Sequence, residues 1–159
     1  GDPVIYMEHK ELWGLEGEVI ESETAALGKA AVLQEGKDIT LVTWSRTVHT
    51  ARDAVTMAAA KGISVELIDL RTIWPWDRDT VLASAARTGR LLVAHEAVRT
   101  AGFGAEIAAE VAERLGVRVK RLGGPRIHVG YSKPLEDEAR IGNGLILSSL
   151  EELMRGVPE

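Results

Sequence analysis

The sequence predicts an α/β fold of three layers, in which a mostly parallel open sheet carries helices on both faces. Short apolar segments rich in β-branched residues alternate with longer segments whose apolar positions recur at helical spacing. This alternation is typical of βαβ units, whose right-handed crossovers place helices on a parallel sheet. A hydrophobic content of 45% in 159 residues is enough to build the core of such a domain.

Five segments are predicted to form the strands of this sheet. The clearest is residues 39–44, where Ile39, Thr40, Val42 and Thr43 favour an extended backbone. The predicted strands are residues 30–33, 39–44, 64–68, 91–94 and 117–122.

A helix is predicted after each of the last four strands, because apolar residues recur there every three or four positions. Gly62 and Gly116 stand where the first and third helices should end, and Asp77 can cap the start of the second. The apolar positions of the four helices are Val48, Ala51, Val55 and Ala58; Val81, Leu82 and Ala85; Phe103, Ile107, Val111 and Leu115; and Leu147, Leu150, Leu153 and Met154. Between the last strand and the last helix we expect a polar, glycine-rich segment.

The N-terminal part of the chain does not follow the alternating pattern. Residues 4–7 are predicted to form a short apolar strand, and residues 8–23 an extended polar linker. Because a lone strand cannot bury itself, we expect residues 1–24 to be the end of an upstream domain plus a linker. Residues 25–159 then form the α/β domain. The first residues lack the basic and apolar regions of a targeting sequence and read as a cut end.

Composition and charge exclude several classes of function. The net charge of −5, with scattered Lys and Arg, argues against nucleic acid as the main partner. The absence of cysteine excludes disulfides, thiolate metal sites and cysteine nucleophiles. The four histidines lack metal-ligand spacing, so no metal site is predicted. No apolar stretch is long enough to span a membrane.

Polar residues follow three of the predicted strands at the point where each strand ends. The three groups are Trp44-Ser45-Arg46, Asp69-Leu70-Arg71 and His95-Glu96. Because the carboxyl ends of parallel strands meet at one edge, where ligands bind in open α/β sheets, these groups should converge there. The sequence therefore predicts a functional site at this edge.

Each group has a functional and a structural interpretation. His95 can transfer a proton or contact a substrate, or it can be a structural histidine bonded to a backbone group or to Glu96. Asp69 and Arg71 can form an anion site or a salt bridge that fixes their loop.

Two further motifs also leave two interpretations open. Gly102-Phe103-Gly104 precedes a predicted helix, where backbone N–H groups can meet an anion, but the segment lacks the third glycine of a dinucleotide fingerprint and also fits a tight turn. Trp74 and Trp76 flank Pro75, either as an exposed interface or as a loop packed on its own sheet.

Several motifs fall in order and resemble one known family. Residues 69–77, D-L-R-T-I-W-P-W-D, resemble the signature D-L-R-T-x-x-P-x-D. Residues 95–97, H-E-A, followed by residues 102–107, G-F-G-A-E-I, resemble a second signature, and the G-K-A at 28–30 resembles the opening of the same domain. Together they resemble the C-terminal, transketolase-type domain of the E1 β subunit of 2-oxo acid dehydrogenase complexes. The resemblance covers about residues 25–122.

The resemblance also includes the N-terminal residues, whereas after Leu122 the sequence departs in part from the family pattern. Residues 3–12 resemble the last strand of the preceding pyrimidine-binding domain. Residues 124–131, G-P-R-I-H-V-G-Y, replace the family's D-T-P-x-P stretch, whereas residues 134–136 keep P-L-E.

The resemblance implies an enzyme whose chemistry depends on other parts of the complex. The family carries out thiamine-diphosphate-dependent oxidative decarboxylation and transfers the acyl group to lipoyl groups of E2. The activating glutamate belongs to the pyrimidine domain and the magnesium-binding G-D-G…N motif to the α chain. We therefore expect this chain to bind neither thiamine diphosphate nor Mg²⁺, and to be inactive alone.

The resemblance assigns assembly to this domain: pairing with the α subunit and a second β subunit, docking of the E2 subunit-binding domain, and walling of the active-site entrance. It implies His95 and Glu96 as candidate catalytic residues. Asp69, Arg71 and Arg99 become candidates at the active-site edge or in contact with an anion. The expected location is the bacterial cytoplasm, or the mitochondrial matrix if the source is eukaryotic.

Two other functions remain open from the residues. The chain can be part of transketolase or of a deoxyxylulose-phosphate synthase, which act on sugar phosphates. It can also be a free-standing binding module without catalytic activity.

Overall fold

The strands form one five-stranded sheet in the order β1-β3-β2-β4-β5, and the sheet is parallel except at one edge. The computed structural model describes residues 3, 5–18 and 24–155. The strands are β1 (Ala31–Gln34), β2 (Ile39–Thr43), β3 (Val65–Asp69), β4 (Arg90–Val98) and β5 (Arg118–Gly124). Only β1 runs antiparallel, against β3. The predicted α/β class and mostly parallel sheet are confirmed.

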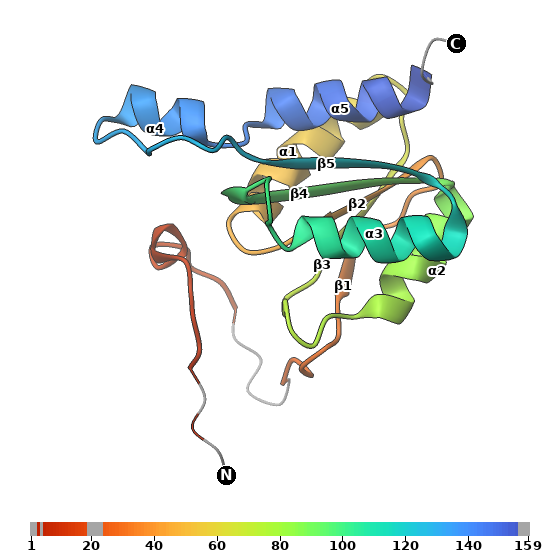
Figure 1. Ribbon diagram of the computed structural model, residues 1–159, viewed down its shortest axis with the longest axis horizontal. Helices are drawn as coiled ribbons and strands as arrows, with labels where there is room; N and C mark the ends of the chain where they lie inside the picture. Colours follow the sequence, from red (N-terminus) through yellow and green to blue (C-terminus); the bar gives the residue numbers. More distant parts are fainter. Residues whose placement is uncertain (1–2, 4, 19–23, 156–159) are drawn as a thin grey trace.

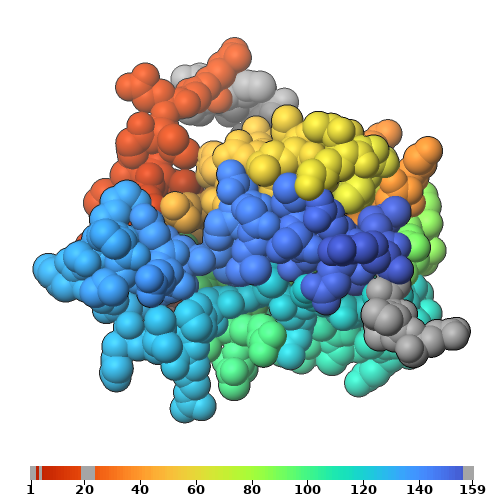
Figure 2. All heavy atoms as spheres, turned by 90° about the horizontal axis from the view of Figure 1, so that it is seen from above, coloured from red at the N-terminus to blue at the C-terminus, as the bar shows by residue number. Residues whose placement is uncertain are grey.

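Helices cover both faces of the sheet (Figure 1). The helices α1 (Thr47–Ala59) and α5 (Asn143–Arg155) pack on one face, and α2 (Arg78–Thr88) and α3 (Gly104–Leu115) on the other. Figure 2 shows the first face, with α1 in yellow and α5 in blue lying side by side. The predicted three layers are therefore present.

The core follows from the alternation of side chains along the strands. On β4, Leu92 and Ala94 face α1 and α5, whereas Leu91 and Val93 face α2 and α3. Because both faces of the central strands are covered, β2 is buried at all of its positions. Each buried Leu or Val of this kind contributes about 1.5–3 kcal/mol to stability.

The predicted helix ends are confirmed at two of three positions. Asp77 caps α2 and accepts a hydrogen bond from the amide of Thr80 at 3.2 Å, and Gly116 ends α3 in the left-handed conformation at φ +61°. At α1 the prediction was wrong, since the helix is capped by Ala60. Gly62 lies two residues farther along, in the turn at φ +78°.

The predicted strand at residues 4–7 is not formed. Ile5, Tyr6 and Met7 are exposed and have no strand pairing, and Val4 lies outside the described residues. An extended segment becomes a strand only when a neighbour takes its backbone hydrogen bonds. The expected linker contains a short 3-10 helix, η1 (Lys10–Leu12), which lies near the carboxyl ends of the parallel strands (Figure 1). Residues 19–23 of that linker lie outside the described residues.

Two elements differ from the sequence prediction. β4 continues to Val98, so His95 lies within a strand rather than after it. The expected polar, glycine-rich segment contains α4 (Lys133–Ala139), which has Ser132 at its N-cap and Pro134 in its first turn. α4 buries no residue, so its sequence lacks the apolar stripe by which helices are predicted.

Both edge strands are poorly suited to accept another strand. β1 has four residues and an irregularity between Val32 and Gln34. β5 carries Arg118 and Lys120, which bind the carbonyl of Leu153 and the carboxylate of Glu152 on α5.

Candidate functional site

The carboxyl ends of β3, β2 and β4 lie next to one another, as predicted. Thr43 pairs with Asp69 across β2 and β3, and Val42 pairs with Val93 across β2 and β4. The polar groups after these positions therefore share one edge of the sheet. We call this region the carboxyl edge.

His95 is buried, with 1% of its surface exposed. Its ring stacks on Trp44 at a centroid distance of 5.1 Å. Neither ring nitrogen has a hydrogen-bond partner within the described part of the chain. Burial lowers the pKa of His95 below its usual value, and the nearby cation of Arg121 acts in the same direction. The backbone of Ala97 acts on this pKa in the opposite direction. The bond to Glu96, one of the two structural alternatives for His95, is absent.

The two glycines of the G-F-G motif enclose this imidazole. A Cβ atom on Gly104 would lie 2.6 Å from His95 Cδ2, and one on Gly102 would lie 2.6 Å from His95 Cε1. Both distances are shorter than any tolerable contact. The glycines therefore allow close packing around His95, and the tight-turn interpretation explains them better than an anion cradle does.

An aromatic cluster extends from His95 to the loop after β3. Phe103 meets Trp44 at 6.1 Å and Trp76 at 6.5 Å, each time edge to face. The cluster consists of Trp44, Trp76, His95 and Phe103, and it includes the only phenylalanine of the chain.

The interface interpretation was wrong for Trp76 and fits Trp74. Trp76 is 6% exposed and belongs to the core, whereas Trp74 is 76% exposed. Asp77, the residue after Trp76, anchors the end of this loop, because its other carboxylate oxygen accepts a hydrogen bond from the amide of Ala30 at 3.0 Å. Trp76 is thus buried beside an anchored residue, while Trp74 faces solvent.

Glu96 points away from the aromatic cluster and joins a set of ion pairs. Its carboxylate lies 2.9 Å from His9 Nε2 and 3.8 Å from Arg140 Nε. Glu11 pairs with both Arg140 and Arg46. We call this set the ion-pair network; its members are His9, Glu11, Arg46, Glu96 and Arg140.

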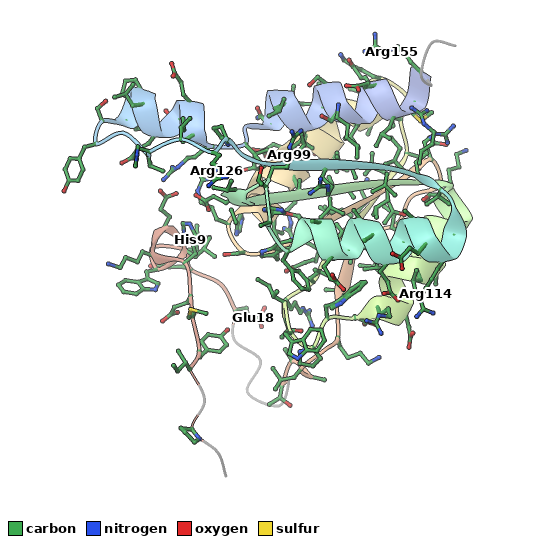
Figure 3. All side chains as sticks on the ribbon, viewed as in Figure 1. His9, Glu18, Arg99, Arg114, Arg126 and Arg155 are labelled. Carbon is green, nitrogen blue, oxygen red and sulfur yellow. The ribbon has the colours of Figure 1, made fainter. Side chains whose placement is uncertain are left out.

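The ion-pair network holds four parts of the chain together: η1, the loop before α1, the end of β4 and the end of α4. Sequence reasoning missed the pairing of His9, Glu11 and Arg140 with their partners, because these residues are far apart in the chain and no motif links them to one another. Figure 3 shows His9 at the same end of the molecule as Arg99 and Arg126, whereas Arg114 and Arg155 lie at the other end.

Asp69 and Arg71 do not form the predicted salt bridge. Asp69 Oδ1 instead accepts a hydrogen bond from the amide of Arg71 at 3.0 Å, which leaves the guanidinium exposed. Arg71 has φ +58°, a conformation that non-glycine residues adopt rarely. Burial raises the pKa of Asp69 above its usual range, against the opposing effects of the Arg71 amide and of the cations of Arg71 and Arg52.

A groove of about 550 Å³ lies beside Asp69 and Arg71. Its walls come from the N-terminal segment, from the start of α1 and from the loop after β3. The polar residues along it are Ser45, His49, Arg52, Asp69, Arg71 and Thr72.

Arg99 lies at the same end of the molecule but outside this groove. Its amide donates a hydrogen bond to the carbonyl of Gly124 at 3.0 Å, and its carbonyl accepts one from Arg121 Nη1 at 3.3 Å. Its backbone thus ties the loop after β4 to the end of β5.

Neither a metal cluster nor a membrane helix occurs in the ranges that the structure covers. No three His, Asp or Glu side chains of those ranges are arranged to hold a metal ion. None of their helices combines the length and apolarity of a membrane span.

Comparison with known proteins identifies the family to which the chain belongs. The model of the family described as "Transketolase, C-terminal domain" matches residues 28–144. The chain belongs to the transketolase C-terminal domain family. A solved structure with this fold is a split-gene transketolase, described as an inactive beta4 tetramer, with a TM-score of 0.79 and 25% identity. That match covers 89% of the present chain and 47% of the transketolase chain.

This transketolase C-terminal domain also resembles three β subunits in sequence. It is 39% identical over 160 residues to the acetoin:2,6-dichlorophenolindophenol oxidoreductase subunit beta of Cupriavidus necator, covering 98% of this chain and 47% of that protein. It is 48% identical over 115 residues to the pyruvate dehydrogenase E1 component subunit beta of Staphylococcus epidermidis, covering 71% and 35%. It is 47% identical over 116 residues to the mitochondrial 2-oxoisovalerate dehydrogenase subunit beta of Dictyostelium discoideum, covering 71% and 31%. The chain thus spans less than half the length of these relatives.

Proposed function

We propose that this chain is the C-terminal domain of the β subunit of a thiamine-diphosphate-dependent 2-oxo acid dehydrogenase, E1. The observation that carries the proposal is the identity of 39–48% to three β subunits, against 25% to the transketolase structure. Residues 25–159 form the domain, and residues 1–24 the linker and the end of a pyrimidine-binding domain. Oxidative decarboxylation then occurs only in the full complex.

The residues of this chain do not fit a thiamine diphosphate site. The G-F-G motif is its best approximation to a phosphate-binding loop, and the imidazole of His95 fills the space between its glycines. The described residues also offer no acidic cluster for Mg²⁺. We propose that the cofactor and its metal are held by other parts of the enzyme, as the resemblance to E1 β subunits implies.

The role of the domain is assembly. Trp74 and Ile73 form an exposed apolar surface on the loop after β3. Ile127, Val129 and Tyr131 form a second one on the loop before α4. Exposed apolar surface of this kind is typical of protein interfaces. We assign these surfaces to contacts with the E1 α subunit, the second β subunit and the subunit-binding domain of E2.

His95 and Glu96 act at the active-site entrance as positioning residues. The buried imidazole fixes the loop at residues 99–103, and Glu96 fixes η1 through His9. Together they hold the carboxyl edge as one wall of the entrance.

The test uses the full-length β subunit that contains this domain, coexpressed with its α subunit. With thiamine diphosphate and Mg²⁺ added, pyruvate or a branched 2-oxo acid should reduce 2,6-dichlorophenolindophenol. The double variant Trp74→Ser, Ile73→Ser should lose α–β assembly in light scattering, whereas Met57→Ser, at an exposed apolar residue on α1, should keep it.

Each alternative function has its own outcome. Transfer of a two-carbon unit between sugar phosphates, with no dye reduction from any 2-oxo acid, would establish the transketolase or deoxyxylulose-phosphate synthase alternative. A β chain with neither activity and no α partner would support the binding module.

A further inference from the structure

We propose that the groove at the carboxyl edge binds an organic oxyanion, a carboxylate or phosphate attached to an apolar body. The proposal rests on the geometry of the groove and does not depend on the reaction of the enzyme. The groove is distinct from the His95 packing site and from the ion-pair network.

The size of the groove suits a small molecule. Its volume of about 550 Å³ falls within the range of roughly 300–1,000 Å³ that is usual for ligand sites. Three separate parts of the chain line it. The N-terminal part contributes Tyr6, Leu12, residues 25–27 and Leu33; the start of α1 contributes Ser45, Val48, His49 and Arg52; and the loop after β3 contributes Asp69, Arg71 and Thr72. Such sites at the carboxyl ends of strands are common in open α/β sheets.

Two cations of the groove have no acidic partner within the described part of the chain. Among the residues that the structure describes, neither Arg52 nor Arg71 has a carboxylate oxygen within 4.0 Å of its side-chain nitrogens. Arg46 and Arg140, at the same end of the molecule, are both paired. His49 lies one turn before Arg52 on α1 and lines the same space. Free guanidinium groups beside a hollow favour a carboxylate or a phosphate, which they can bind with two hydrogen bonds each.

Asp69 gives the groove an acceptor without cancelling its positive charge. It is the only acidic residue along the groove in the described chain, and one of its oxygens is occupied by the Arg71 amide. Two arginines therefore face one carboxylate. A hydroxyl or amine of the ligand, placed next to its anionic group, can donate to the other oxygen.

The remaining lining is apolar. Leu12, Leu27, Leu33 and Val48 contribute, and Tyr6 adds an aromatic ring. Inorganic phosphate would leave this surface in water, whereas an attached ring or alkyl chain would cover it. The groove is therefore suited to an organic anion rather than to a bare ion.

Four probes separate these features in a titration of the full-length α–β enzyme saturated with thiamine diphosphate and Mg²⁺. Phenyl phosphate and benzoate carry an anion on a ring, phenol carries the ring alone, and inorganic phosphate the anion alone. Calorimetry should give dissociation constants of about 1 mM or below for phenyl phosphate or benzoate. Phenol and phosphate should bind at least about tenfold more weakly. The stronger of the two anions identifies the natural group as phosphate or carboxylate.

Variants locate the binding. Arg52→Gln and Arg71→Gln should each weaken phenyl phosphate binding about tenfold. Arg126→Gln, at an exposed arginine outside the groove, should leave it unchanged. Arg71→Lys and Arg52→Lys keep the charge and should retain part of the affinity, which guards against variants that fail to fold. In wild type, bound phenyl phosphate should slow amide hydrogen exchange in residues 45–52 and 69–72.

Two results would overturn the proposal. One is the absence of binding by any organic anion up to about 10 mM, as when another part of the protein covers the groove. The other is wild-type affinity in the folded Arg52→Gln, Arg71→Gln double variant. Neither result bears on dye reduction by the 2-oxo acid, so failure here is distinguishable from failure of the proposed function.

Discussion

Two groups of side chains at the carboxyl edge differ sharply although they begin at adjacent residues. His95 belongs to the aromatic cluster, which is packed between the sheet and α3. Glu96 belongs to the ion-pair network, which is open to solvent and joins η1 and α4 to the sheet. Because side chains alternate along β4, one residue of the H-E-A motif faces the core and the next faces away.

This difference shows how one motif can serve two purposes. The aromatic cluster contributes stability through close packing, and it tolerates little change in volume. The ion-pair network contributes little stability, because exposed ion pairs are screened by water and salt. It determines instead where the N-terminal segment lies. The following predictions test this contrast, beginning with the largest effect.

Trp76→Ala should lower the free energy of unfolding by about 3–5 kcal/mol, because it removes a buried aromatic ring from the core. Trp74→Ala, two residues away, should change it by less than about 0.5 kcal/mol, because that ring faces solvent. Urea unfolding followed by circular dichroism measures both. Similar losses for the two variants would contradict the assignment of Trp76 alone to the cluster.

Gly104→Ala should lower the free energy of unfolding by about 1–3 kcal/mol, because the new methyl group would lie 2.7 Å from His95 Nε2. The matched control is Gly144→Ala on α5, where no atom lies within 4 Å and alanine should stabilise the helix slightly.

A double-mutant cycle tests whether His95 is the residue with which the added methyl group of Gly104→Ala clashes. In a His95→Ala background the added methyl group has room, so Gly104→Ala should cost at least about 0.5 kcal/mol less than in wild type. Strictly additive losses would show that the glycine is required for some other reason.

Stability should fall as the pH drops below about 6.5, the usual pKa of a histidine in an unfolded chain. The folded-state pKa of His95 is lowered by burial, so the unfolded chain takes up a proton there that the folded chain does not. The contribution of His95 is thus fully present above this pH and is lost with a slope of at most about 1.4 kcal/mol per pH unit.

His95→Leu removes this pH dependence. The substitution itself should lower stability at both pH values, because it removes the stacking on Trp44 and places a branched side chain between Gly102 and Gly104. The test therefore compares the differences between pH values. Unfolding curves at pH 5.0 and 7.5 should differ less for the variant than for wild type, and equal differences would place the titrating group elsewhere.

Arg140→Gln should have only a small effect on global stability, less than about 1 kcal/mol, although it removes the centre of the ion-pair network. Its main effect should be local, since Glu11 of η1 loses one of its two arginine partners and keeps only Arg46. Faster tryptic cleavage at Lys10 measures the loss, and salt should accelerate cleavage of wild type more than of the variant. Unchanged cleavage would show that the network does not hold the segment.

Much of the fold follows from local patterns that the sequence displays directly. The apolar strands and the helix stripes depend on residues close in the chain, and parallel pairing then places Trp44, Asp69 and His95 at one edge. The convergence of these residues could therefore be predicted without a structure.

Features that depend on distant residues could not be predicted. Glu11 and Arg140 are 129 positions apart, and nothing in either neighbourhood indicates the other. Trp76 is buried next to Asp77, whose carboxylate accepts a hydrogen bond from the amide of Ala30, 47 positions away, and nothing near either residue in the sequence indicates this contact. The groove is formed by three segments, and only Ser45, Asp69 and Arg71 in it were among the strand-end residues that the sequence predicted to converge. α4 was missed because it packs no apolar face into the core.

The design of the two outer strands limits how this domain can be joined to others. Neither edge strand is suited to pair with a strand of another molecule. β1 is short and irregular, and Arg118 and Lys120 of β5 bind groups on α5. Copies of the chain at high concentration are thereby protected from edge-to-edge polymerisation into continuous β-structure. Partners must instead recognise side chains on loops and helices, which lets surfaces diverge in specificity while the sheet beneath them stays the same.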